Sequence, residues 1–126
     1  MPVRSVLVVD DSPAVRKAVC ELLTREREFE VCGEAENGSE AIEKAQRLRP
    51  ALIVTDLSMP VMNGLEETRV LKKLMPALPV IIYTAHSSPL VEKEALAAGA
   101  SAVISKSDAV TALIGKAREL LDSIAA

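Results

Sequence analysis

Residues 54–64, VTDLSMPVMNG, join a buried strand to a helix. The strand is the end of an apolar run that begins after Pro50 without polar alternation, as is typical of strands buried on both faces of a parallel sheet. Asp56 follows that strand directly, at the edge where open α/β folds bind ligands. Asn63 predicts a helix start, as an N-cap with Glu66 as its capping-box partner. By itself, Asp56 could be only a solvated loop carboxylate, as most aspartates in such a position are.

Apolar strands alternate with amphipathic helices along the rest of the chain. We expect strands at 5–9, 29–34, 52–55, 80–83 and 102–104, and helices starting near residues 13, 38, 64, 89 and 109, the last capped by Asp108. Such alternation predicts βαβ units with helices on both faces of a parallel sheet. The predicted fold class is α/β, a flavodoxin-like, doubly wound (βα)5 sandwich with a five-stranded parallel sheet of order 2-1-3-4-5. Residues 1–126 are expected to form a single domain, without an output domain in this chain.

The composition limits the classes of function. With 126 residues, 49% hydrophobic and 26% charged, the chain suits one globular domain. Aromatic residues make up 2% and the net charge is −3, which argues against direct nucleic-acid binding by this chain. No apolar run approaches the roughly 20 residues of a membrane helix and no signal peptide precedes the first strand, so we expect a cytoplasmic protein. Cys20 and Cys32 lack metal-ligand spacing and are predicted to be small hydrophobic residues, with a disulfide as the alternative.

Polar side chains stand at the ends of the predicted strands. Asp10 and Asp11 end the first strand and Asp56 the third, while Thr84 ends the fourth and Lys106 follows the fifth. The carboxyl ends of parallel strands share one edge of the sheet. In the order 2-1-3-4-5 the first and third strands are neighbours, so the three aspartates are expected to meet at the topological switch point.

Three carboxylates in one crevice require a cation or a proton. Two like charges ~4 Å apart repel by roughly 4 kcal/mol at an effective dielectric constant near 20. Mg²⁺ commonly binds one or two carboxylates, several waters and a phosphate oxygen. With Thr84 as a hydroxyl donor and Lys106 as a mobile cation, the set indicates phosphoryl chemistry. Asp56 stands alone between the aspartate pair and the Thr/Lys side, so it is the candidate nucleophile.

These segments together resemble the receiver domain of bacterial two-component response regulators. The matching segments are VVDDS at 8–12, DLSMPVMNGLE at 56–66, YTA at 83–85, and AGA at 98–100 leading to Lys106. They span nearly the whole chain in the order and spacing of that family.

The resemblance implies a function and a role for each residue. Asp56 would accept a phosphoryl group from a sensor histidine kinase or phosphotransfer protein, and the domain would switch conformation to control a downstream partner in phosphorelay signal transduction. Asp11, Asp56 and the backbone carbonyl of Ser58 would hold Mg²⁺, with Asp10 acting partly through water. Lys106 would pair with the phosphoryl oxygens and Thr84 would swing toward them. Output would use the face of the fourth helix, fifth strand and fifth helix, and the chain would catalyse only its own phosphoryl transfer and dephosphorylation.

Two positions depart from the family's usual pattern. Val103 stands where many receivers have a tyrosine or phenylalanine that rotates with the threonine, and Ser107 stands where many have a proline. Val103 puts in question whether an aromatic side chain reports the movement of the threonine. Ser107 puts in question the rigidity of the loop that holds Lys106. His86 is expected to be a solvated loop residue.

Three other functions remain open at this point. A metal-dependent phosphatase with an Asp nucleophile usually has an acid two residues beyond that nucleophile, where this chain has Ser12 after Asp10. A flavin-binding module needs a phosphate-cradling loop after the first strand, where Asp10 and Asp11 would repel phosphate. A receiver used only as an interaction domain would not need the complete acidic set.

Overall fold

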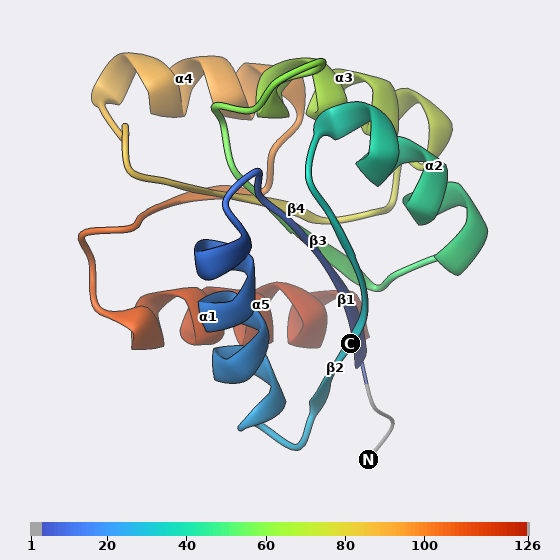
Figure 1. Ribbon diagram of the computed structural model, residues 1–126, viewed down its shortest axis with the longest axis vertical. Coiled ribbons are helices and arrows are strands. Elements are labelled where there is room, and N and C mark those ends of the chain that lie inside the picture. The colour runs from blue at the N-terminus through green and yellow to red at the C-terminus, as the bar shows by residue number, and fades with distance from the viewer. Residues whose placement is uncertain (1–3, 126) are drawn as a thin grey trace.

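The computed structural model describes residues 4–125, and the outer ends of the predicted domain, residues 1–3 and 126, lie outside the described residues. Within this part, strands and helices alternate along the chain (Figure 1). The strands are β1 (Arg4–Val9), β2 (Phe29–Ala35), β3 (Leu52–Thr55), β4 (Val80–Thr84) and β5 (Ala102–Ser105). The helices are α1 (Pro13–Thr24), α2 (Gly38–Leu48), α3 (Gly64–Leu74), α4 (Pro89–Ala98) and α5 (Val110–Ala125). Neighbouring strands pair in parallel in the order β2-β1-β3-β4-β5, which confirms the predicted flavodoxin-like (βα)5 fold.

Helices cover both faces of the sheet, with α1 and α5 on one face and α2, α3 and α4 on the other (Figure 1). Side chains of one strand alternate between the two cores: Val6 and Val8 pack on the α1–α5 side, and Leu7 and Val9 on the opposite side. All four residues of β3 are buried. Both faces of this strand are covered, which explains the apolar run Leu52–Val54, and the one polar side chain of the strand, Thr55, is hydrogen-bonded within the protein. None of the helices described here has both the length and the apolar character needed to cross a membrane.

The helix starts follow the predicted caps in all but one case. A side-chain oxygen of the residue before the helix accepts a backbone N–H from the first turn at Ser12, Asn37, Asn63 and Ser88. Asn63 also donates its Nδ2 to Glu66 Oε1 at 3.1 Å, so the two residues do pair, but through the asparagine amide and not through the backbone N–H that a capping box uses. The predicted cap at Asp108 is wrong, because α5 begins only at Val110.

The two cysteines lie on opposite sides of the sheet. Cys20 packs against the core on the α1–α5 side and Cys32 against the core under α2 and α3. Cys32 sits at the register shift between β1 and β2, where its thiol donates to the Val6 carbonyl at 3.5 Å. Both cysteines are free and partly buried, as predicted, and the sheet between them rules out the alternative of a disulfide.

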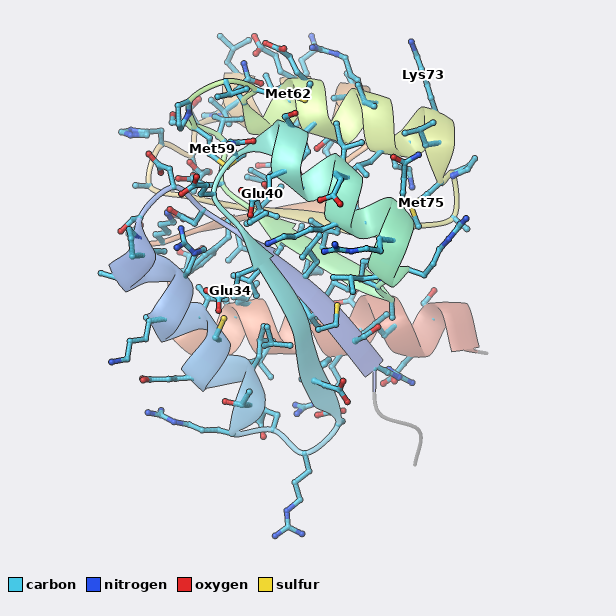
Figure 2. All side chains as sticks on the ribbon, turned by 45° about the vertical axis from the view of Figure 1, so that its right-hand side comes forward. Glu34, Glu40, Met59, Met62, Lys73 and Met75 are labelled. Atoms are coloured by element: carbon cyan, nitrogen blue, oxygen red, sulfur yellow. The ribbon has the colours of Figure 1, made fainter. Side chains whose placement is uncertain are left out.

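The loop after β3 is fixed to two helices. The Gly38 N–H at the start of α2 donates to the Met62 carbonyl at 3.0 Å, and Met59 and Met62 both lie in this loop (Figure 2). The Gly64 N–H at the start of α3 donates to the Leu57 carbonyl at 2.9 Å. A Cβ at Gly64 would stand 2.2 Å from the Asp56 carbonyl oxygen, so only glycine permits this approach. The backbone around Asp56 is therefore held directly by the helix that follows it.

Candidate functional site

Three carboxylates meet where β1 and β3 end. The register pairs Val9 with Thr55, so Asp10 and Asp56 leave neighbouring strands side by side. One carboxylate oxygen from each of Asp10, Asp11 and Asp56 lies within 4.8 Å of the others. Asp10 and Asp56 are buried, at 4% and 8% exposure, whereas Asp11 is exposed. The structure thus brings together the aspartates that the sequence placed at this edge.

Lys106 closes the site from the end of β5. Its Nζ donates to Asp10 Oδ2 at 2.9 Å and to Asp56 Oδ2 at 3.3 Å. Burial alone would lower the pKa of Lys106, but the hydrogen bond to Asp10 and the charges of Asp56 and Asp10 outweigh burial and raise it. The ammonium group also lies 5.8 Å from the centroid of the Tyr83 ring. Lys106 is thus held as a cation between two of the three carboxylates.

Backbone groups orient the two buried aspartates. The Leu57 N–H donates to Asp56 Oδ1 at 2.7 Å, and the Ser12 N–H donates to Asp10 Oδ1 at 2.9 Å. Each aspartate therefore has one oxygen bound to the backbone and the other bound to Lys106. Such fixed donors pre-organise carboxylates for metal binding or for attack on an electrophile.

Thr84 and the loop residues lie around this centre. Thr84 is the last residue of β4 and is fully buried, and its hydroxyl oxygen accepts the His86 N–H at 3.1 Å. The His86 side chain is exposed, as predicted. Val103 is partly buried and packs against the core that includes Val80, Ile82 and Ala95, so it is a packing residue on the α4 side. Ser58 is exposed in the loop after β3.

The donor set fits a hard divalent cation. Three carboxylates and one ammonium group leave an excess of two negative charges, which one divalent cation would neutralise. Mg²⁺ holds oxygen ligands at about 2.1 Å, so oxygens on opposite sides of the ion are about 4.2 Å apart. One oxygen from each of the three aspartates lies within 4.8 Å of the other two, so the three carboxylates are near enough to share one ion.

Two supporting groups were not predicted from the sequence. Arg16 donates its Nη1 to the Asp10 carbonyl oxygen at 2.7 Å and its Nε pairs with Glu34 at 3.3 Å. Glu67, in α3, is fully buried and accepts a hydrogen bond from the Thr55 hydroxyl at 2.7 Å. The signal for Glu67 was its spacing: it stands three residues after Gly64 and four before Leu71, on the face of α3 that packs inward.

Comparisons with known proteins agree with this geometry. The model of the response regulator receiver domain family matches residues 6–118. The protein-glutamate methylesterase/protein-glutamine glutaminase of Pyrococcus abyssi is 42% identical over 123 residues, which are 96% of this chain and 33% of that protein. The transcriptional regulatory protein LnrK of Bacillus subtilis is 36% identical over 101 residues, 80% of this chain and 46% of that protein. The chain therefore spans less than half the length of either curated relative.

A solved structure extends the agreement to the backbone. The response regulator domain of Thermotoga maritima CheB superposes with a TM-score of 0.87 at 31% sequence identity, over 95% of this chain and 97% of that chain.

Proposed function

The chain belongs to the response regulator receiver domain family, and from this membership we propose the roles of its individual residues. Receiver domains serve two-component signal transduction, and no observation favours the phosphatase alternative. We propose that Asp56 accepts the phosphoryl group, that Lys106 pairs with its oxygens and that Thr84 responds to it. The observation that carries this proposal is the placement of Asp56, which is buried beside Asp10 and Asp11 and within 3.3 Å of the Lys106 ammonium.

The proposed transfer forms one bond and breaks another. A carboxylate oxygen of Asp56 attacks the phosphorus of a phosphohistidine while the bond from phosphorus to the imidazole nitrogen breaks, and the imidazole leaves with the electron pair and takes up a proton. Lys106 then compensates negative charge on the phosphoryl oxygens. We propose that the chain catalyses no turnover beyond this transfer and the later hydrolysis of its own acyl phosphate.

We propose that Asp10, Asp11, Asp56 and the Ser58 carbonyl oxygen hold Mg²⁺. When bound, the ion would neutralise charge on the carboxylates and on the incoming phosphoryl group. The support is the excess of negative charge and the spacing of the three aspartate oxygens described above.

The proposed metal site makes Asp11→Asn informative. Mg²⁺ at roughly ten times its dissociation constant should stabilise the wild type by about 1.4 kcal/mol, since it binds only the native state, and should raise the melting temperature by about 5 °C. Asp11 is exposed, so its substitution should leave the fold intact but remove most of this gain. Thermal unfolding followed by circular dichroism measures both effects, with potassium chloride of equal ionic strength as the control. If Mg²⁺ raised the melting temperature of both proteins equally, Asp11 would not be a ligand of the metal.

Two surfaces suit the proposed partners. A groove of about 480 Å³ is lined by α1, Tyr83 and Lys106 and so reaches the phosphoryl site, where a histidine kinase or phosphotransfer protein must approach. On α4, Leu90 and Leu96 are exposed, at 65% and 47%. We propose that the face made by α4, β5 and α5 contacts a downstream protein or output domain.

We also propose that the phosphoryl transfer takes place in the cytoplasm.

We expect Thr84→Ala to separate phosphorylation from its response. The Thr84 hydroxyl accepts the His86 N–H, so an inward movement of Thr84 would carry the loop that leads into α4. The variant should still accept a phosphoryl group at Asp56, but its amide resonances at 84–90 should no longer shift when beryllofluoride is added. Thr24→Ala, at an exposed position, is the control. A full response at 84–90 in Thr84→Ala would contradict the proposed route.

Mass spectrometry tests the proposed function directly. The protein is incubated with acetyl phosphate and Mg²⁺, its intact mass is measured, and the acyl phosphate is located after borohydride reduction and digestion. A single phosphoryl group on Asp56 is the expected result. No mass gain, or a gain at another residue, would overturn the proposal.

A further inference from the structure

Glu67 is a buried carboxyl group that metal binding does not use. It lies in α3 with no exposed surface, and its Oε1 accepts the Thr55 hydroxyl at 2.7 Å. Among the buried side chains that the structure describes, its Oε2 is the one polar atom without a hydrogen-bond partner. Burying a carboxyl group with an unpaired oxygen destabilises a protein, and more so if the group is charged.

The partner of Glu67 connects it to the phosphoryl site. Thr55 is the last residue of β3 and directly precedes Asp56. Its hydroxyl also lies 3.3 Å from the Asp56 carbonyl oxygen, the atom that the backbone of Gly64 approaches so closely. The Glu67 carboxyl group thus bonds the end of β3 to α3 at the point where both contact the peptide of Asp56.

An apolar residue would suit the surroundings of Glu67 better than a carboxyl group. The inward face of α3 otherwise carries Gly64, Thr68 and Leu71, and the Thr68 hydroxyl is already satisfied by the Gly64 carbonyl at 2.7 Å. Replacing buried ionisable groups by apolar ones of similar volume is often neutral or stabilising. A buried ionisable residue that does not increase stability is therefore expected mainly near functional sites.

We propose that Glu67 is a positioning residue for phosphoryl acceptance, which acts by holding the Thr55 hydroxyl and thereby fixing the peptide of Asp56. Without this anchor, the Thr55 hydroxyl would donate to the Asp56 carbonyl oxygen instead, and the end of β3 would be free to shift against α3. Small displacements of a nucleophile are sufficient to slow a reaction, since about 1 Å can reduce a rate by up to ~10²-fold. The inference rests on the proposed function of Asp56.

The test measures phosphorylation by acetyl phosphate with saturating Mg²⁺, as a function of acetyl phosphate concentration, in Glu67→Leu and Glu67→Gln. Each assay is run well below the melting temperature of the variant, so a purely structural role leaves the rate unchanged. We expect Glu67→Leu to lower the maximal rate constant about tenfold, without changing the half-saturating concentration. Glu67→Gln keeps an acceptor for Thr55 and should retain nearly the wild-type rate. Glu66→Gln, an exposed position in the same turn, is the matched control.

Thr55→Val removes the same hydrogen bond from the other side and should slow the reaction as Glu67→Leu does, even if the leucine variant does not fold. Because both changes break one bond, the double variant should lose no more than either single variant. A wild-type rate in Glu67→Leu or Thr55→Val, or equal losses in the leucine and glutamine variants, would overturn the proposal. A wild-type protein that gains no phosphoryl group would instead overturn the proposed function, and this inference with it.

Discussion

Asp56→Asn is expected to abolish phosphorylation by acetyl phosphate, a loss of at least about 10⁴-fold, because an amide is not a nucleophile. The fold should persist, since the asparagine oxygen can still accept the Leu57 N–H that now donates to Asp56 Oδ1. The variant also removes one of three crowded negative charges, so its free energy of unfolding should be unchanged or slightly higher. Intact mass measures the phosphorylation, and urea unfolding measures the stability.

The control for this variant is Asp108→Asn, which changes an exposed carboxylate in the loop before α5. It should be phosphorylated at the wild-type rate. If Asp56→Asn gained a phosphoryl group as rapidly as Asp108→Asn, another residue would be the acceptor and the role proposed for Asp56 would be wrong.

The arrangement of the sheet and its aspartates could be predicted because both follow from local patterns. Val54 belongs to an apolar run and Asp56 follows it directly, so the position of the carboxylate along its strand was fixed by the chain itself. The parallel order then placed Asp10 beside Asp56, because all strands of such a sheet end at the same edge. Each step used neighbours in sequence or a general rule of topology, and neither depends on side-chain packing.

Other features depend on packing and were not predictable in this way. Val61 adopts a φ of 68°, which is unfavourable for a β-branched residue, while the Met62 N–H donates to the Pro60 carbonyl at 2.7 Å. The loop between β3 and α3 imposes this conformation, and the sequence at Val61 argues against it.

The burial of Glu67 was also not predicted, since a glutamate in the first turns of a helix is normally solvated and interacts with the helix dipole. Its spacing places it on the inward face of α3, but only the packing of α3 on the sheet shows that the carboxyl group is fully buried.

Burial also determines the protonation state of Glu67. It raises the pKa of this carboxyl group to about 8, and the Thr55 hydrogen bond only partly opposes the increase. In the unfolded chain the pKa is about 4.3. Between about pH 4.3 and 8, the folded protein therefore binds more protons at Glu67 than the unfolded chain does, so stability falls as the pH rises through this window. Below about pH 4.3 the full stability is present, and above about pH 8 the loss is complete.

Glu67→Gln is therefore expected to flatten the dependence of stability on pH. The wild type should lose about 3 kcal/mol more than the variant between roughly pH 5 and pH 8, equivalent to about 10 °C in melting temperature for a domain of this size. Urea unfolding of the two proteins at several pH values measures the difference. Glu66→Gln, whose side chain is exposed, should follow the wild-type curve. If the free energy of unfolding fell equally with pH in the wild type and Glu67→Gln, Glu67 would already be ionised in the folded protein at about pH 5. Burial would then not keep this carboxyl group protonated, and the prediction would be wrong.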